Sequence, residues 1–166
     1  MTTMEAVFLG LVQGITEFLP VSSTGHLVLT RFFLDFGGTE ALAFDAILHL
    51  ATAVAVIVYF HRDLILLAHT VVRKLARLPV NPRDMTLLSA LVMGTIPAVI
   101  FGLLLESMME TLFRNPLLVA GVLVLGSFLF MYAEWRYLNM ARKPDMTVKK
   151  GFTIGLFQTL ALIPGM

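Results

Sequence analysis

The sequence predicts an all-α integral membrane protein, with multiple spanning helices and a re-entrant helix hairpin, arranged as the first half of an inverted-repeat architecture. Of the 166 residues, 58% are hydrophobic and 14% are charged, whereas soluble domains carry about 25% charged residues. Two runs, Thr86–Leu105 and Pro116–Ala133, contain no charged residue. At about 1.5 Å per residue, each crosses most or all of a hydrocarbon core of about 30 Å. A third run, Ala41–Phe60, carries only Asp45 and His49.

Composition excludes several kinds of function. The chain contains no cysteine, which excludes disulfides, thiolate metal sites and a cysteine nucleophile. Its net charge is only +1, so the charge balance predicts no nucleic-acid partner. The predicted partner of the chain is therefore a lipid bilayer, in which residues 1–166 form a single membrane domain.

The positive charges are concentrated in two segments, and their distribution predicts the orientation in the membrane. Residues 62–85 and residues 134–150 each carry five Lys or Arg residues, whereas residues 106–115 carry two acids and a single Arg114. Because cytoplasmic loops are enriched in Lys and Arg, the basic segments are predicted inside, and residues 37–40 and 106–115 outside. Apolar side chains within residues 62–85 also predict an amphipathic helix at the cytoplasmic interface.

Residues 4–36 are predicted to form the re-entrant hairpin. As helices, Met4–Leu19 would be about 24 Å long and Thr24–Phe36 about 20 Å, so neither crosses the hydrocarbon core alone. Pro20 and Gly25 interrupt the run between them. We expect the chain to enter from outside, turn between these two residues, and leave on the same side. Such a turn is tolerated where it is buried in protein or lines a wet cavity.

A second segment, residues 151–166, resembles the first. Gly10–Gln13 reads Gly-Leu-Val-Gln and Gly155–Gln158 reads Gly-Leu-Phe-Gln, and each is followed by apolar residues and a proline. The first segment begins outside and the second follows an inside loop, which is the pattern of an inverted-topology repeat. Residues 151–166 are therefore predicted to start a second re-entrant segment, which is expected to be truncated before its return half.

The candidate functional site begins with Glu17, the only acid between Ala6 and Thr30. A carboxylate at membrane depth marks a functional site more often than a packing role. Gln13 lies four residues earlier and so shares its helix face. Glu17 is a candidate general base, divalent-cation ligand or partner of a hydroxyl. The structural alternative is a protonated carboxyl bonded to a backbone carbonyl.

The turn after Glu17 is rich in hydrogen-bond donors. Successive amides at the start of a helix can bind an anion, which makes Ser22, Thr24 and Gly25 candidate phosphate-binding residues. The alternative role for the hydroxyls is helix N-capping. Ser23 and His26 are candidate catalytic groups for nucleophilic attack or proton transfer, although a lone histidine also occurs as a satisfied core residue.

Asp45 and His49 are four residues apart and are expected on one face of the third apolar run. Two interpretations stay open at this point. Either these side chains complete the polar cavity around the hairpin tip, or they bond to each other.

These residues resemble the undecaprenyl-diphosphate phosphatase family of bacteria, the bacitracin-resistance type of integral membrane phosphatase. The first motif of that family is Glu or Gln, three residues, Glu, and then Phe-Leu-Pro-Val-Ser-Ser-Thr-Gly-His. It is present as Gln13–His26. The resemblance continues through Phe44–Asp45, Thr95–Ala98 and Gln158–Gly165, so it covers essentially the whole chain.

The resemblance implies removal of the terminal phosphate from undecaprenyl diphosphate, a polyprenyl diphosphate lipid, at the external face of the bacterial plasma (inner) membrane. This reaction recycles the carrier lipid for peptidoglycan synthesis and gives bacitracin resistance. Gln13, Glu17, Ser23, Thr24 and His26 carry over as active-site positions. The expected cofactor is a divalent cation, Mg²⁺, bound by Glu17 with Gln13 beside it.

The chain departs from the family at its C-terminal end. Family members are longer, and their second motif, Pro-Gly-x-Ser-Arg-Ser, supplies an arginine and a serine, whereas this sequence stops at the third position, Met166. The chain is therefore expected to be an N-terminal fragment, inactive as it stands. The alternative functions are an inverted-repeat membrane transporter and a lipid flippase, which would move a substrate without releasing phosphate.

Overall fold

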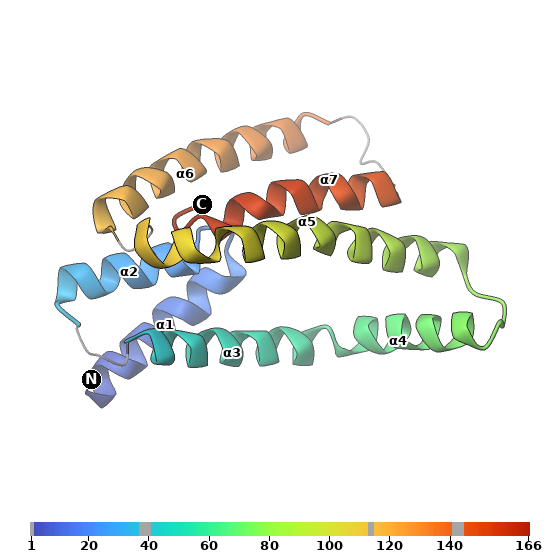
Figure 1. The fold of residues 1–166 in the computed structure, drawn as a ribbon, viewed down its shortest axis with the longest axis horizontal. Coiled ribbons are helices and arrows are strands. Elements are labelled where there is room, and N and C mark those ends of the chain that lie inside the picture. The colour runs from blue at the N-terminus through green and yellow to red at the C-terminus, as the bar shows by residue number, and fades with distance from the viewer. Residues whose placement is uncertain (1, 37–40, 113–114, 141–144) are drawn as a thin grey trace. The chain divides into compact units, whose positions relative to one another are not determined.

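The computed structural model describes residues 2–36, 41–112, 115–140 and 145–166 (Figure 1). Within these residues the chain is helical and contains no strand, which confirms the all-α prediction. The helices are α1 (Thr3–Phe18), α2 (Ser23–Leu34), α3 (Ala41–Tyr59), α4 (His61–Leu75), α5 (Pro82–Leu112), α6 (Pro116–Leu138) and α7 (Val148–Gln158), followed by the 3-10 turn η1 (Thr159–Leu162).

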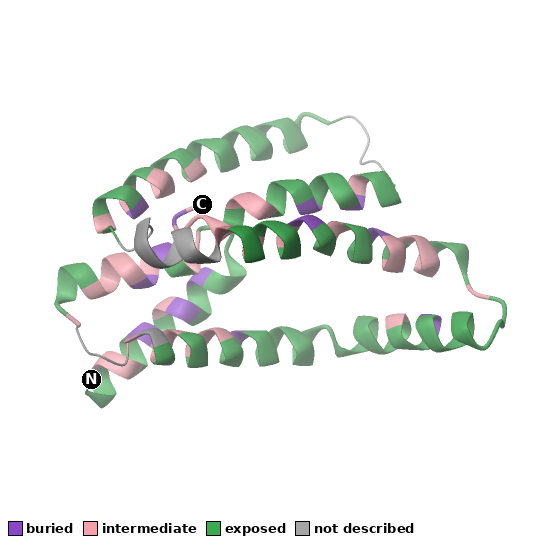
Figure 2. Cartoon of the chain, in the orientation of Figure 1, coloured by how far each residue is buried: buried purple, intermediate pink, exposed green. Residues whose placement is uncertain are grey.

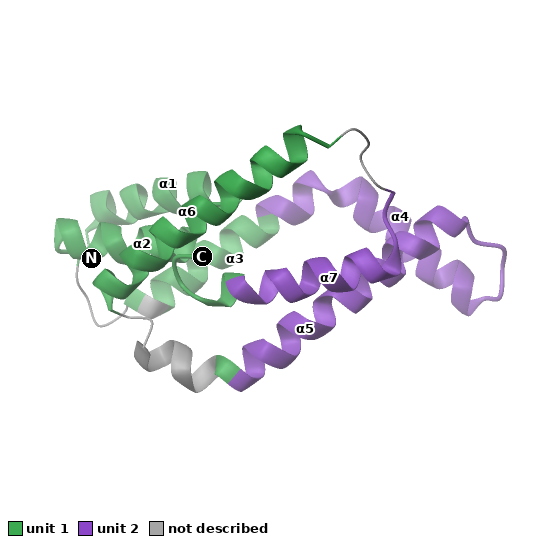
Figure 3. Ribbon diagram, turned by 90° about the horizontal axis from the view of Figure 1, so that it is seen from above, with its two compact units in different colours: residues 1–54, 105–141, 161–166 green, residues 55–104, 142–160 purple. Residues whose placement is uncertain are grey.

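The chain divides into two compact units, which are coloured separately in Figure 3. Unit 1 contains residues 1–54, 105–141 and 161–166, and unit 2 contains residues 55–104 and 142–160. Every residue predicted for the candidate site belongs to unit 1.

The hairpin of unit 1 is set by its local sequence. A capping box starts α1, in which Thr2 accepts a hydrogen bond from the Glu5 amide and Glu5 accepts one from the Thr2 amide. The helix ends at Phe18 because Pro20 disfavours helical backbone at the residue before it, and Leu19 is extended. After a short turn, α2 begins at Ser23.

One detail of the predicted turn is wrong. Gly25 does not interrupt the helical run but lies in the first turn of α2, and the left-handed residue of the turn is Ser22, with φ 62°. The glycine has a packing role instead. A Cβ atom added to Gly25 would lie 3.0 Å from the Cα atom of Gly165, so a side chain at residue 25 would push the C-terminal segment away.

The core of unit 1 is small. Helix α2 packs against both α1 and α6. The apolar side chains enclosed at these contacts are Leu9, Leu27 and Val119, one from each helix. Gln13 is buried with them, so a polar side chain occupies part of the core beside the hairpin tip.

In unit 2, α5 and α7 approach each other through glycines. A Cβ atom added to Gly155 would clash with the backbone of Gly94, and one added to Gly151 would clash with Ala90. Small residues of this kind let helix backbones come close together in membrane proteins.

The membrane-spanning predictions are supported by helix length and composition. Among the described residues, Pro82–Leu105 and Pro116–Leu138 are long and apolar enough to cross a membrane, and only 11% and 6% of their most apolar windows are buried. Figure 2 shows this exposure along α6. Apolar surface on this scale is typical of helices that contact lipid or other protein. The predicted third span corresponds to α3, which passes the same test together with α4 across a bend of 75°.

Candidate active site

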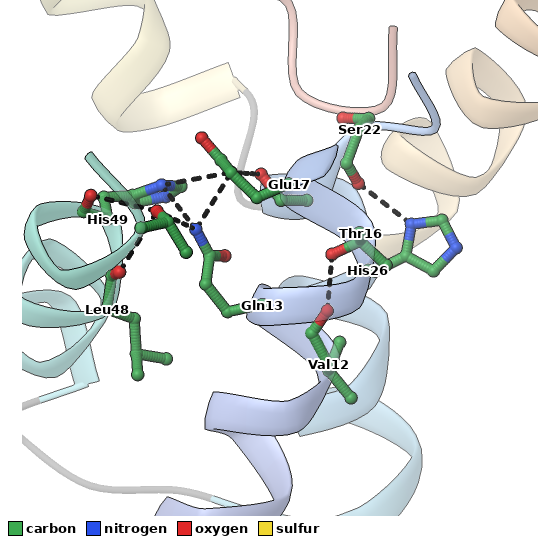
Figure 4. Close-up of polar contacts among 10 residues, drawn as sticks. Val12, Gln13, Thr16, Glu17, Ser22, His26, Leu48 and His49 are labelled. Atoms are coloured by element: carbon green, nitrogen blue, oxygen red, sulfur yellow. Dashed lines mark hydrogen bonds and ion pairs between the residues drawn. The ribbon is translucent and has the colours of Figure 1, made fainter. Parts of the chain in front are cut away.

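Glu17 is the centre of a polar cluster built from three helices of unit 1 (Figure 4). Its Oε2 atom accepts hydrogen bonds from Gln13 Nε2 in α1, at 2.9 Å, and from Ser23 Oγ in α2, at 2.6 Å. The same oxygen lies 3.7 Å from His49 Nδ1 in α3. The Glu17 side chain is 31% exposed. The carboxyl group is therefore held by the protein and is still partly exposed at its surface.

Gln13 is the buried hydrogen-bond donor of this cluster. The side chain is 1% exposed. Its two Nε2 protons are shared among three acceptors: Glu17 Oε2 and His49 Nδ1, each at 2.9 Å, and Thr52 Oγ1 at 3.3 Å. Because an amide NH₂ group has no acceptor capacity, His49 Nδ1 must be the acceptor, and neutral His49 then carries its proton on Nε2. Gln13 Oε1 is buried and has no hydrogen-bond partner in the described part of the chain.

The serines of the turn do not act as side-chain caps. No side chain caps the N-terminus of α2; instead, Ser23 donates its hydroxyl proton to Glu17, and Ser22 Oγ accepts from the Gly165 amide at 2.9 Å. The first amides of a helix have no intrahelical partner. The N-terminus of α2 is therefore a site at which an anion can replace the missing cap.

His26 is anchored by one ring nitrogen. Its Nδ1 lies 2.9 Å from the backbone carbonyl oxygen of Ser22. A carbonyl only accepts, so Nδ1 donates, and the neutral ring has its unprotonated nitrogen at Nε2. The structure thus places the Ser23 hydroxyl against Glu17 rather than against His26, and it brings together a Ser–Glu pair and not a Ser–His pair.

The two residues predicted on α3 have separate partners. His49 joins the Glu17 cluster, whereas Asp45 forms an ion pair with Arg31 of α2 at 2.5 Å. Arg31 also donates to the carbonyl oxygens of Phe36 and Ala41, each at 3.5 Å. The guanidinium therefore ties the end of α2 to the start of α3.

Thr52 and the Gly165 amide belong to the site and were not predicted from the sequence. Thr52 follows Asp45 and His49 at helical spacing, so all three share one face of α3, and this periodicity was the available signal. No such signal exists for the contact of Gly165 with Ser22, because the two residues are 143 positions apart. That contact places the segment predicted to start the second re-entrant copy on the N-terminus of α2.

The described residues contain no group of three or more His, Cys, Asp or Glu side chains that could hold a metal ion. Mg²⁺ is nevertheless often bound through one or two carboxylates together with substrate phosphates. Glu17 can supply one such carboxylate, because both of its hydrogen bonds from described residues reach Oε2. Gln13 presents its NH₂ group to Glu17, so its amide acts here as a hydrogen-bond donor.

Comparison with known proteins gives a consistent family assignment. The family model described as "Bacitracin resistance protein BacA" matches residues 6–166. An undecaprenyl-diphosphatase of Rubrobacter xylanophilus is 43% identical over 98% of this chain and 61% of its own length. Those of Moorella thermoacetica and Pseudomonas fluorescens are 40% and 35% identical over 100% and 99% of the chain, and over 61% and 58% of their own lengths. The chain thus spans about three fifths of these curated relatives. No solved structure matches it.

Proposed function

Because the chain belongs to the bacitracin resistance protein BacA family, we propose that its protein dephosphorylates undecaprenyl diphosphate to undecaprenyl phosphate. This reaction recycles the carrier lipid for peptidoglycan synthesis and gives resistance to bacitracin. The protein acts in the bacterial plasma (inner) membrane, with its site facing outward. The curated relatives that carry the name undecaprenyl-diphosphatase support the reaction, and the basic segments at residues 62–85 and 134–150 support the orientation.

The observation that carries the mechanism is the 2.6 Å hydrogen bond from Ser23 Oγ to Glu17 Oε2. A hydroxyl that donates to a carboxylate is prepared to lose its proton to that base. In the proposed first step, Ser23 Oγ attacks the terminal phosphorus while Glu17 accepts the hydroxyl proton. The bond from phosphorus to the bridging oxygen breaks, and undecaprenyl phosphate leaves. Water then cleaves the phosphoseryl bond, with His26 as the proton-transfer group.

The phosphate groups are held by the start of α2. The amides of Ser23, Thr24 and Gly25 point along the first turn of a 12-residue helix that no side chain caps, and the helix dipole favours negative charge there. We propose that Ser22 and Thr24 line this site with their hydroxyl groups. The Ser22 hydroxyl already accepts from the Gly165 amide, so its proton is free to point toward a phosphate oxygen.

We further propose that a divalent cation, Mg²⁺, is bound by Glu17 together with the substrate phosphates. Gln13 would orient the carboxylate through its hydrogen bond rather than bind the ion. When bound, the cation neutralises charge that develops on the phosphate oxygens. Phosphate release should therefore fall to background in EDTA and return when Mg²⁺ is added in excess.

Phosphate release from undecaprenyl diphosphate in proteoliposomes tests the proposal, with the Rubrobacter xylanophilus relative as the positive control. The substitutions are made in the gene product that contains these 166 residues. We expect Glu17→Gln and Ser23→Ala to lower turnover by at least about 100-fold, since each removes one partner of the pair. The matched controls are Glu5→Gln and Ser127→Ala, which change a capping carboxylate and a hydroxyl bonded within α6.

Two outcomes would contradict the mechanism. Wild-type turnover in the Ser23→Ala variant would show that the serine is not the nucleophile. Transport of the lipid across the bilayer without phosphate release, in vesicles where the positive control releases phosphate, would favour the flippase.

A further inference from the structure

Helix α4 is an amphipathic helix of unit 2 whose apolar face has no protein partner among the described residues. Leu64, Ile65, Val72 and Leu75 are between 43% and 79% exposed. Their spacing of one, eight and eleven residues from Leu64 places them on one side of the helix. Arg73 lies on the opposite side of the helix from Leu64. His69 lies at the edge of the apolar face, because it follows Ile65 by four residues.

The direction of α4 differs from that of α3. The helix axis turns by 75° from α3 at Phe60, over a break of at most four residues. Helix α3 alone has 19 residues, about 28 Å at 1.5 Å per residue, which already approaches the thickness of the hydrocarbon core. If α3 follows the membrane normal, α4 therefore lies close to the membrane plane, at the end of a span.

Three cations on or directly after α4 have no acidic partner among the described residues. Arg62 and Lys74 lie on α4, and Arg77 follows its end; all three are exposed. None of them forms an ion pair within the described residues, where the Arg–carboxylate pair is Arg31–Asp45. A fourth cation, Arg73, donates to the carbonyl oxygen of Pro79.

The C-terminal end of α4 supports a role for Arg77 beyond helix capping. Its φ is 56°, a left-handed conformation in which glycine is favoured and other residues are strained. The Leu78 amide donates to the Arg73 carbonyl across this residue, which closes the helix. An arginine in this left-handed conformation destabilises the end of the helix relative to a glycine. A favourable interaction of the guanidinium group with an anion would offset that loss.

From these observations we propose that α4 is an interfacial helix that binds anionic phospholipid headgroups. Its apolar face enters the boundary between headgroups and acyl chains, while Arg62, Lys74 and Arg77 contact the phosphates of anionic lipids. Each cation near an anionic membrane surface raises the binding constant for that surface about fivefold. The inference uses no residue of the candidate active site and is independent of the catalytic proposal.

The depth of α4 is tested with single cysteines, because the chain has no cysteine of its own. Val72→Cys reports on the apolar face and His69→Cys on the polar edge of that face. Each variant is labelled with a fluorescent dye and placed in nanodiscs of phosphatidylcholine and phosphatidylglycerol at 3:1. We expect brominated lipid to quench the dye at residue 72, and aqueous iodide to quench the dye at residue 69.

The lipid preference is tested in the Val72→Cys background by comparing brominated phosphatidylglycerol with brominated phosphatidylcholine. The anionic lipid should quench several-fold more than its share of the bilayer predicts. Removing two charges with Lys74→Gln and Arg77→Gly should bring this ratio close to one. The glycine suits the left-handed backbone of residue 77, so a loss of preference in this variant does not come from a weaker helix. The matched control, Arg136→Gln with Lys149→Gln, lowers net charge equally and should leave the ratio unchanged.

Three outcomes would overturn the proposal. Equal quenching by lipid at residues 69 and 72 would mean that α4 continues the span of α3. Protection of both dyes from lipid and iodide would mean that protein covers the helix. A quenching ratio that the Lys74→Gln, Arg77→Gly variant does not change would mean that the helix inserts through its apolar face without recognising anionic headgroups.

Discussion

At the scale of single residues, the geometry assigns different partners to the candidate catalytic groups. Glu17 Oε2 is bound by donors from Gln13 and Ser23, so Glu17 functions as an acceptor at the start of the proposed reaction. His26 has one ring nitrogen fixed by the Ser22 carbonyl. The other nitrogen is then the part of this side chain that can exchange a proton.

The role of His26 is separable from its contact with the turn. In His26→Asn, the side-chain amide can still donate to the Ser22 carbonyl, but the distal ring nitrogen is lost. We expect phosphate release to fall by about 100-fold or more, while the melting temperature stays near that of the wild type. The control is His61→Asn, since His61 Nδ1 makes a similar contact, 2.8 Å from the Val58 carbonyl, at the start of α4. Wild-type turnover of His26→Asn would show that the histidine only holds the turn.

At the scale of elements, close backbone approach organises each unit. The two glycines of α7 that face α5, Gly151 and Gly155, leave no room for a Cβ atom. In unit 1 the N-terminal turn of α2 approaches Gly165 in the same way. These contacts are polar or van der Waals contacts between backbones, which is how helices associate where lipid competes for apolar side chains.

Replacing Gly155 by Ala should therefore destabilise unit 2. The new methyl group meets the backbone of Gly94, and overpacking of this kind costs about 1–3 kcal/mol. We expect a lower melting temperature in detergent for Gly155→Ala, measured by the loss of helical circular dichroism. Gly102→Ala in α5 is the matched control. No atom lies within 4 Å of its added Cβ, and Ala favours a helix over Gly by about 1 kcal/mol, so its melting temperature should stay equal or rise. Equal destabilisation by both substitutions would contradict the close approach of α5 and α7.

At the scale of the whole molecule, the distribution of charge fixes the predicted orientation. Residues 62–85 and 134–150 hold ten of the twelve Lys and Arg residues. The long apolar helices α5 and α6 connect these basic segments through residues 106–115, where a single Arg114 stands among two acids. A basic segment at each end of a helical pair places both ends on the same side of the membrane.

The two ends of α6 test this orientation. Asn115 precedes the helix and Asn139 follows it, and both cap it through hydrogen bonds. We expect a membrane-impermeant maleimide to label Asn115→Cys in spheroplasts, and to label Asn139→Cys only after the membrane is permeabilised. The native chain gives no background, because it has no cysteine. The reverse pattern would place the proposed site on the cytoplasmic side.

Much of the fold could be predicted because it depends on local physical properties. Hydropathy and length predict helices at α5 and α6, the apolar periodicity of residues 62–85 predicts α4, and Pro20 ends α1 through the restriction on Leu19. The four-residue spacing of Gln13 and Glu17 places both on one face of α1, and the two side chains do form a hydrogen bond. The metal role of this pair and the catalytic roles of the turn stay predictions.

The sequence by itself thus determined the helical membrane class, the end of the first helix before Pro20, and the polar composition of the hairpin tip. Only the tertiary structure decided which side chains contact one another. It separated Asp45, which pairs with Arg31, from His49, which joins Glu17, and it replaced the expected break at Gly25 with a contact to Gly165. The physical reason is that helical periodicity fixes which residues share a face, whereas the rotation and approach of neighbouring helices fix what that face meets.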